Sequence, residues 1–333
     1  MRITTELAAL RHDPAPLLAG AVLTGEAARD WREGAAPAVL ADLARYGAGT
    51  ELGECPALAA LVEGEGGEAH RVAGAGLGDM IAAMRAAPLA PVPWRHFTNG
   101  VLHSLVLGLA GRGSLSLALL DGPAWTATRD PRGEALASFQ PGELHVRVLA
   151  GGGTARILRN RSDDPRVARI EAEPLILRPG ASYSLDGAHE ALAIDRIDGA
   201  LVTLRLHRRP VGASVARQYE IVGGALVHQA AGLQDDSRAE LAMALLRAMG
   251  RRDAAPAFAA LVRTGACSGE PAARWQALRE CLALDSAVGL EELCRVAETP
   301  GDPLVAPARA LLEALVARDP AFAKAREALL CPA

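Results

Sequence analysis

Apolar residues divide the chain into three regions by their spacing, and the first region has a helical spacing. From residue 1 to about 90 they recur every three or four positions, which predicts amphipathic helices. The clearest segments are 5–10, 38–46 and 79–84. The glycine-rich run 74–79 predicts a loop, with Asp79 as the N-cap of the helix that follows. Pro88, Pro91 and Pro93 end the helical pattern, because proline cannot donate a helical hydrogen bond. We therefore expect a first, helical domain of residues 1–93.

From about residue 95 to residue 230 the spacing changes to two, as in strands with one buried face. Glycines interrupt this pattern, and each interruption predicts a turn between two strands. The four interruptions are 111–113, 151–153, 198–199 and 223–224. The clearest hairpin would join 191–196 to 201–208, because Asp198-Gly199 favours the positive φ angles of a tight turn. Regular hairpins without crossover helices predict a small antiparallel barrel or sandwich of residues 94–232.

After residue 232 the helical spacing returns as a repeat. Longer helices are expected at 237–249, 271–284 and 304–318, and shorter segments that begin at Asp253, Asp285 and Asp319 lie between or after them. Ser237 and Glu240 match a capping box, and Pro271 suits a first helical turn. A helix-pair period of roughly 33 residues is typical of an α-solenoid. The segment 271–278 resembles the first helix of a HEAT-type repeat, and a plain helical bundle is the alternative for this third domain, residues 233–333.

Composition narrows the classes of function. The net charge is −4 with both signs interspersed, so no broad cationic face is expected for nucleic acid. No apolar run approaches the roughly 20 residues that span a bilayer, and the first ten residues lack the pattern of a secretory signal. The five cysteines are far apart and form no CxxC pair, which predicts reduced thiols and a cytoplasmic protein.

Two motifs in the β region resemble the cupin superfamily, and within it the cysteine-dioxygenase-like thiol dioxygenases. Residues 144–152 are similar to the strand and glycine turn after the first cupin motif, and residues 177–189, with Pro179-Gly180, are similar to the second. The resemblance covers about Asn99 to Pro210 and implies that His189 is a metal ligand. The predicted fold class is therefore α+β: a central antiparallel cupin-like β-barrel flanked by an N-terminal helical segment and a C-terminal α-helical, HEAT-like domain.

The sequence departs from this family at the metal site. No histidine lies between His103 and His145, so the family's HxH pair is absent. His145 falls where many cupins carry a glutamate ligand, which leaves His145 and His189 as a two-histidine remnant. A ferrous site generally needs three protein ligands, so we expect no cofactor. The alternative is Fe²⁺ held with a third ligand from His103 or His207.

A second set of polar residues lies on one predicted strand. Thr203, Arg205 and His207 alternate with apolar residues and therefore share a face. They match the positions where the resembled family carries a Ser-x-His-x-Tyr chain, with all three identities changed. With Tyr183 they form the predicted ligand-binding set, because a guanidinium offers a two-point fork to a carboxylate. The alternative is a solvated face, and in either case Asp195 could pair with Arg205 across the hairpin.

These observations favour a non-catalytic protein without catalytic residues, which binds another protein through its C-terminal helices and senses a small anionic ligand. The first alternative is an iron-dependent dioxygenase that acts on a small thiol or carboxylate. The second is that the helices carry the function and the barrel is a rigid spacer. No binding to nucleic acid or membrane is expected.

Overall fold

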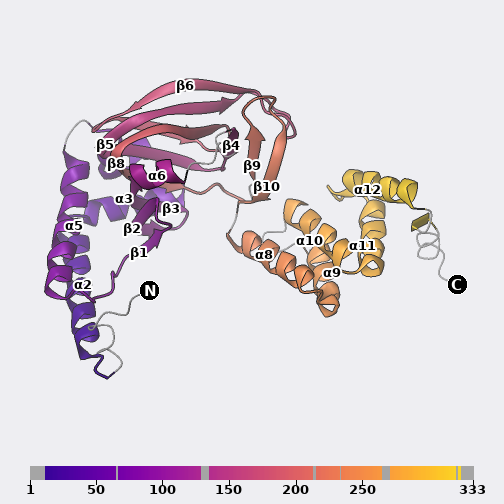
Figure 1. Ribbon diagram of the computed structural model, residues 1–333, viewed down its shortest axis with the longest axis horizontal. Helices are drawn as coiled ribbons and strands as arrows, with labels where there is room; N and C mark the ends of the chain where they lie inside the picture. Colours follow the sequence, from indigo (N-terminus) through magenta and orange to yellow (C-terminus); the bar gives the residue numbers. More distant parts are fainter. Residues whose placement is uncertain are drawn as a thin grey trace. The chain divides into compact units, whose positions relative to one another are not determined.

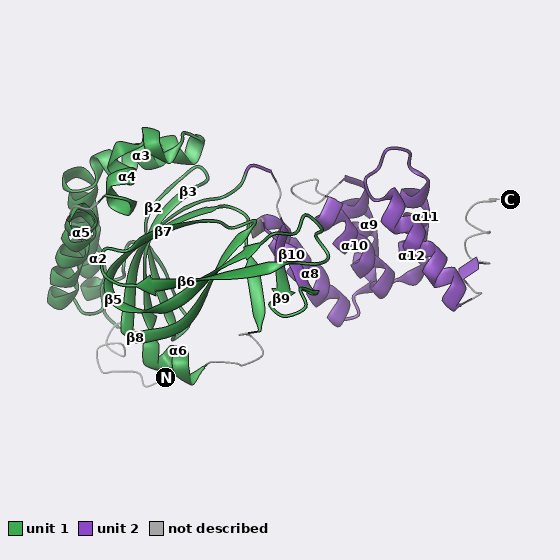
Figure 2. Ribbon diagram, turned by 90° about the horizontal axis from the view of Figure 1, so that it is seen from above, with its two compact units in different colours: residues 1–210, 218–227 green, residues 211–217, 228–333 purple. Residues whose placement is uncertain are grey.

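The computed structural model describes residues 12–64, 67–128, 135–212, 215–232, 234–264, 271–319 and 322–323. The chain divides into two compact units (Figure 2), called unit 1 (residues 1–210 and 218–227) and unit 2 (residues 211–217 and 228–333). The fold class is α+β, as predicted, because helices accompany antiparallel sheets. Among the described residues, no helix has both the length and the apolar composition that crossing a membrane requires. The predicted domain boundaries at 93 and 232 stay predictions.

Helices begin unit 1 (Figure 1). They are α2 (Ala15–Gly34), α3 (Pro37–Ala48), the 3₁₀ turn η1 (Leu52–Glu54), α4 (Pro56–Val62) and α5 (Glu68–Ala86). Helices are confirmed at 38–46 and 79–84, whereas 5–10 lies outside the described residues. The loop expected at 74–79 is wrong, because this run lies inside α5. Gly76 shows the reason: a Cβ there would lie 2.8 Å from the Trp31 side chain, so the glycine lets α5 approach α2.

The main sheet of unit 1 has seven antiparallel strands. They are β1 (Arg95–Thr98), β2 (Leu102–Ala110), β3 (Gly113–Asp121), β5 (Glu143–Asn160), β6 (Ile170–Leu177), β7 (Ser182–Asp186) and β8 (Glu190–Arg208). Their order is β1-β2-β3-β8-β5-β6, and β7 also pairs with β5. A second sheet has the order β10-β9-β4, with bounds Leu226–Ala231, Val215–Glu220 and Leu136–Phe139, and helix α6 (Gly122–Ala127) follows β3. The expected closed barrel is wrong: β1 and β6 end the strand order without pairing with each other.

Two of the four predicted glycine turns are confirmed and two are wrong. Residues 111–113 join β2 to β3, and 223–224 lie between β9 and β10. Residues 151–153 and 198–199 instead lie inside the long strands β5 and β8, which pair with each other and shift register there. Gly151 has a φ of 79°, and a Cβ on it would lie 1.7 Å from the Ala200 carbonyl oxygen. These glycines therefore allow bulges and close strand contact, and the predicted 191–208 hairpin is one continuous strand.

Both faces of β8 are buried in unit 1. Leu204 and Leu206 pack with Leu43 and Tyr46 in the cluster that the helices contribute to. On the other face, Leu201 packs in a separate apolar cluster formed by strands. Residues two apart on a strand project to the same side. Thr203 and Arg205 therefore lie on the same face of β8 as Leu201.

Unit 2 is helical after β10. Its helices are α8 (Gln234–Ala248), the 3₁₀ turn η2 (Arg252–Ala254), α9 (Ala255–Thr264), α10 (Pro271–Leu284), α11 (Ser286–Glu298) and α12 (Val305–Arg318). The predicted helical segments here are confirmed for the described residues. Asp285 caps α11 by accepting hydrogen bonds from two backbone amides, and the last predicted segment, after Asp319, lies largely outside the described residues.

The pairs α9–α10 and α11–α12 repeat one another in their contacts. The Arg274 Nε–H donates to the Val262 carbonyl oxygen, and the Arg309 Nε–H donates to the Ala297 carbonyl oxygen, with both donor and acceptor displaced by 35 residues. Buried residues also correspond between the two helix pairs at a displacement of 35 positions. Phe258 corresponds to Leu293, and Ala273 corresponds to Ala308. The same local packing is therefore used twice in succession.

Candidate anion-binding face

Strand pairing places one row of polar residues on a common face of the main sheet. Arg205 of β8 lies opposite Ser116 of β3 on one side and Val146 of β5 on the other. Val146 in turn lies opposite Tyr183 of β7. Directly paired residues of neighbouring strands project to the same side of the sheet. Ser116, Arg205 and Tyr183 therefore lie on one face, together with Thr203, which is two positions before Arg205.

Arg205 is a half-buried cation without a carboxylate partner in the part of the chain that the structure describes. Its Nε–H donates to Thr203 Oγ1 at 3.1 Å. Burial lowers the pKa of the Arg205 guanidinium, and Tyr183 acts in the opposite direction. The prediction that Asp195 pairs with Arg205 is wrong: Asp195 accepts hydrogen bonds from Arg156 at 2.8 and 3.0 Å. Arg205 therefore keeps donors that an anion could use.

Tyr183 and Thr203 shape the surroundings of Arg205. Burial raises the pKa of Tyr183 to about 12, although Arg205 acts to lower it. The phenol is therefore protonated near neutral pH and can donate a hydrogen bond. Thr203 is only 1% exposed, and its hydroxyl accepts the bond from Arg205 Nε, which orients the guanidinium. The structure thus places Tyr183, Thr203 and Arg205 of the predicted set together.

His207 shares this face but has its own environment. It lies opposite Ser114 of β3, and a Cβ on Gly142 would come within 2.9 Å of His207 Nε2. Burial lowers the pKa of His207, Arg209 lowers it further, and Glu143 opposes them. A neutral imidazole at this position is a hydrogen-bonding group rather than a second cation.

The two predicted metal ligands lie elsewhere. His145 is paired with Leu206 of β8, so it projects to the opposite face, where its ring centroid is 6.2 Å from that of Tyr46. His145 Nδ1 and Ser184 Oγ are 2.7 Å apart, while Nε2 is buried and has no hydrogen-bond partner within the described ranges. His189 is exposed in the turn between β7 and β8. These residues do not join the Arg205 face.

The histidines available for a third ligand are also dispersed. His103 Nδ1 lies 2.8 Å from Thr98 Oγ1 at the β1–β2 edge, and His207 lies on the Arg205 face. Within the described residues, no group of three or more His, Cys, Asp or Glu side chains is arranged to hold a metal ion. The donor set of a three-ligand ferrous site is therefore not assembled in this part of the chain, which does not fit the predicted Fe²⁺ alternative.

Ser114 and Ser116 complete the face and were missed by sequence reasoning. Both are half-buried on β3 and lie opposite His207 and Arg205. The alternation of serine and leucine along 114–117 was the available signal, because it marks one polar face of a strand. Assigning these serines to the Arg205 face also requires the pairing of β3 with β8, which the sequence does not specify.

Arg208, in the same strand as Arg205, provides the contrast of a fully paired cation. Arg208 is on the opposite face, with a side chain only 6% exposed, and its Nη2 lies 2.6 Å from Glu143 Oε1. Its Nη1–H donates to the Thr50 carbonyl oxygen at 2.8 Å, and its Cζ lies 4.4 Å from the centroid of the Tyr46 ring. Arg208 therefore joins the helices to the sheet, whereas Arg205 has no such partner.

No protein-family model and no curated protein matches the chain. Solved structures of cupin-superfamily proteins match part of it. Ectoine synthase from P. lautus is 18% identical over 35% of this chain and 70% of its own, with a TM-score of 0.23. A cupin superfamily protein from Desulfitobacterium hafniense is 16% identical over 34% of this chain and 83% of its own, with a TM-score of 0.22.

CapF in complex with an inhibitor is also similar in part. It is 13% identical over 35% of this chain, with a TM-score of 0.25, and the chain spans only 31% of the length of CapF. TM-scores this low support no functional argument. The candidate site rests on the contacts described above.

Proposed function

We propose that this chain is a non-catalytic binding protein in which the cupin-like β region takes a small organic anion on the Arg205 face and the HEAT-like helices bind another protein. The observation that carries the proposal is the half-buried Arg205 guanidinium, which has one hydroxyl partner and no carboxylate partner among the described residues. A cation withdrawn from water without a counter-charge is costly. A bound anion would supply that counter-charge.

The chemistry of the face favours a carboxylate. A guanidinium binds a carboxylate through two parallel hydrogen bonds. Because Nε of Arg205 is already bonded to Thr203, the two terminal nitrogens are the donors left for the ligand. The Tyr183 phenol, held protonated by a pKa of about 12, adds a donor nearby. The Ser116 hydroxyl lies on the strand opposite.

The helices of unit 2 support the partner-binding half of the proposal. Repeated helix pairs present an extended surface of the kind that binds proteins. On α8, Leu241 and Leu245 are 69% and 61% exposed, and Met249, directly after the helix ends, is 60% exposed. Their spacing of four residues places them on one helix face. An exposed apolar stripe of this kind is suited to another protein.

A thermal-shift screen tests the anion-binding half. The panel contains small carboxylates and inorganic phosphate. A ligand at a hundred times its dissociation constant stabilises a protein by about 2.7 kcal/mol, so a binder raises the melting temperature of the wild-type protein. Arg205→Gln should reduce that rise, and Arg196→Gln, at an exposed arginine paired with Asp198, should retain it in full. If no anion raises the melting temperature, the proposal fails.

Metal analysis separates this proposal from an iron-dependent dioxygenase. Protein purified without chelator should contain only trace metal if the Arg205 face binds an anion without catalysis. The dioxygenase, with His145 and His189 as ligands, requires close to one iron per chain. An iron content near one, lost in His189→Ala, would favour the enzyme.

The partner-binding half has its own test. In an affinity pull-down, proteins that the wild-type chain retains should be lost with Leu241→Glu/Leu245→Glu, because charge on the exposed apolar face of α8 opposes apolar contact. They should be retained with Arg205→Gln. Equal recovery by all three proteins would contradict a role for α8.

A further inference from the structure

A pocket of about 390 Å³ lies in unit 1 between the helices and the first two strands, away from the Arg205 face. Arg32 of α2, Leu40 and Leu43 of α3, and Trp94 and Arg95 at the start of β1 contribute to its lining, and β2 supplies one wall. We propose that this pocket is a second ligand site, which binds a small organic anion with an apolar body. It shares no residue with the Arg205 face.

The charge of the pocket favours an anion. Arg32 and Arg95 both line it, and their side chains form no ion pair or hydrogen bond with any described residue. No aspartate or glutamate contributes to the lining. Two cations beside one pocket repel each other, and an anion between them removes that repulsion while accepting hydrogen bonds from both guanidinium groups. The electrostatic complement of this pocket is therefore a negative ligand.

A buried donor at the same pocket lacks an acceptor. Trp94 is 3% exposed, and its Nε1–H is buried without a hydrogen-bond partner among the residues that the structure describes. Its neighbour Trp31, whose ring packs edge-to-face at 5.5 Å, donates its Nε1–H to the Val72 carbonyl oxygen at 2.8 Å. Buried tryptophans normally find such a partner. This difference between the two indoles is an observation independent of the charges, and it makes Trp94 a sensitive reporter for the pocket that it lines.

The remaining lining favours an apolar body on the ligand. Strand β1 pairs with β2 only from Arg95 opposite Val106 to Thr98 opposite His103, so residues 107–110 of β2, which line the pocket, have no β1 partner. Leu40 and Leu43 contribute aliphatic surface, and Leu109 is 54% exposed. The volume lies in the range of small-molecule sites.

A second pocket of unit 1 provides the contrast. Its volume is about 420 Å³, and its lining comes mainly from α5, β1 to β3 and β8, including His96 and His103, with no arginine or lysine among the lining residues. The two pockets are alike in size and share strands β1 and β2, but only the first combines two unpaired arginines with an unpartnered buried donor. The proposal is therefore made for the first pocket alone.

The indole N–H signal of Trp94 provides a local readout in the full-length protein. The chain has four tryptophans, so Trp94→Phe assigns the signal in a ¹⁵N-labelled sample. The probes are benzoate, its uncharged counterpart benzamide, hexanoate and inorganic phosphate. Benzoate and hexanoate should shift the Trp94 signal in a saturable titration, and benzamide and phosphate should bind more weakly, because one lacks the charge and the other lacks the apolar body.

Variants identify the residues responsible. Arg32→Gln/Arg95→Gln should weaken benzoate binding by about tenfold or more, the effect of losing charge-assisted hydrogen bonds. Arg29→Gln, at an exposed arginine one turn before Arg32 on α2, should leave it unchanged. Arg205→Gln should also leave the Trp94 titration unchanged, so this proposal can fail while the first stands. Because both substituted arginines are exposed, the double variant should fold, and each single variant is a further check.

Three results would overturn the proposal. One is that neither carboxylate shifts the Trp94 signal. Another is equal binding of benzoate and benzamide, which would remove the role of charge. The third is an equal loss of affinity in Arg29→Gln, which would show that only general surface charge matters.

Discussion

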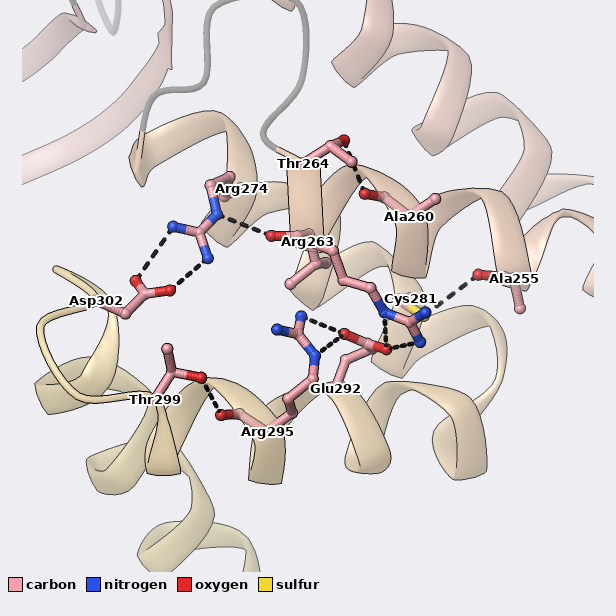
Figure 3. Close-up of polar contacts among 11 residues, drawn as sticks. Ala255, Ala260, Arg263, Thr264, Arg274, Cys281, Glu292, Arg295, Thr299 and Asp302 are labelled. Carbon is pink, nitrogen blue, oxygen red and sulfur yellow. Dashed lines mark hydrogen bonds and ion pairs between the residues drawn. The ribbon is translucent and has the colours of Figure 1, made fainter.

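Units 1 and 2 use arginine in different ways. In unit 2, Glu292 is 1% exposed and lies between Arg263 and Arg295 (Figure 3), with an Arg263 Nε to Oε1 distance of 2.7 Å. Arg274 is likewise paired with Asp302, at 2.5 Å. Burial alone would raise the pKa of Glu292, and the two arginines outweigh burial and hold that pKa below its usual range. These charges join one helix to another.

Unit 1 contains paired arginines too, but it also leaves several without a carboxylate. Arg208 forms an ion pair with Glu143, whereas Arg205, Arg32 and Arg95 have no ion pair with any described residue. An arginine by itself therefore does not indicate a ligand site in this chain. The informative feature is an arginine beside a pocket or a polar face whose counter-charge the protein does not supply.

The largest effect is expected at the crossing of β5 and β8, which exists only in unit 1. Gly151→Ala should lower the stability of unit 1 by roughly 3 to 5 kcal/mol, because it combines a positive φ with a collision against the Ala200 carbonyl. Hydrogen exchange should speed up in β5 and β8 and stay unchanged in α9 to α12. Gly199→Ala is the control: it also has a positive φ, but no neighbouring atom lies within 4 Å, so about 1 kcal/mol is expected.

Removing the buried carboxylate of unit 2 should have the next largest effect. Glu292→Ala loses charge-assisted bonds from two arginines and should cost about 2 to 3 kcal/mol of unfolding free energy, measured by urea denaturation. Asp253→Ala removes an exposed partner of Arg251 and should cost far less, because water screens an exposed ion pair. Equal losses would show that burial does not distinguish the two ion pairs.

Two arginines that lie three positions apart in β8, Arg205 and Arg208, sharpen the contrast within unit 1. Arg208→Met should lower stability by about 2 kcal/mol, because it breaks the bonds to Glu143 and Thr50. Arg205→Met should leave the ligand-free protein unchanged or more stable by up to about 1 kcal/mol, as expected where a residue serves binding and not folding. A loss in Arg205→Met equal to that in Arg208→Met would show that Arg205 is structural.

A smaller effect is expected from pH. Burial lowers the pKa values of His145 and His207 in the folded state, so protonation favours the unfolded chain. Stability is complete above the unfolded histidine pKa, about 6.5, and falls as pH drops from there towards the lowered folded values. Unfolding monitored by fluorescence in a Trp275→Phe background, where the remaining tryptophans belong to unit 1, should show this loss between pH 7.5 and 5.5. His145→Gln should reduce it.

Unit 2 should respond in a different pH range. The lowered pKa of Glu292 stabilises the folded state above the unfolded glutamate pKa, about 4.3, and that contribution is lost as pH falls through the folded value. Its helices should therefore keep their hydrogen-exchange protection between pH 7.5 and 5.5. Loss of protection in α11 over that range would contradict this assignment.

The helices were predictable from sequence because their signals are local. The segment 271–284 carries its own spacing and its own first-turn proline, and it forms α10 at those bounds. The glycine pairs were ambiguous because the same residue serves a turn or a bulge. Gly111 precedes a real reversal, whereas Gly199 lies within β8, and the difference depends on the long-range pairing of β8 with β5.

The candidate site was predictable only within one strand. The period of two places Thr203 and Arg205 on one face, and the structure brings Tyr183 to that face. The partner of Asp195 is Arg156, an interaction between β5 and β8 that a local hairpin could not reveal. Arg32 and Arg95 are 63 positions apart and line one pocket because α2 packs against the segment that precedes β1, where Trp31 contacts Trp94.

Calorimetric titration tests the central claim most directly. The anion that stabilises the protein best in the screen is titrated at pH 7.5 into the wild-type chain, Arg205→Gln and Arg32→Gln/Arg95→Gln. We predict that the double variant, which lacks the second proposed site, retains binding at the Arg205 face, and that the affinity of that face falls at least about tenfold in Arg205→Gln, the effect of losing a bidentate charged contact. Undiminished binding in Arg205→Gln would contradict the account.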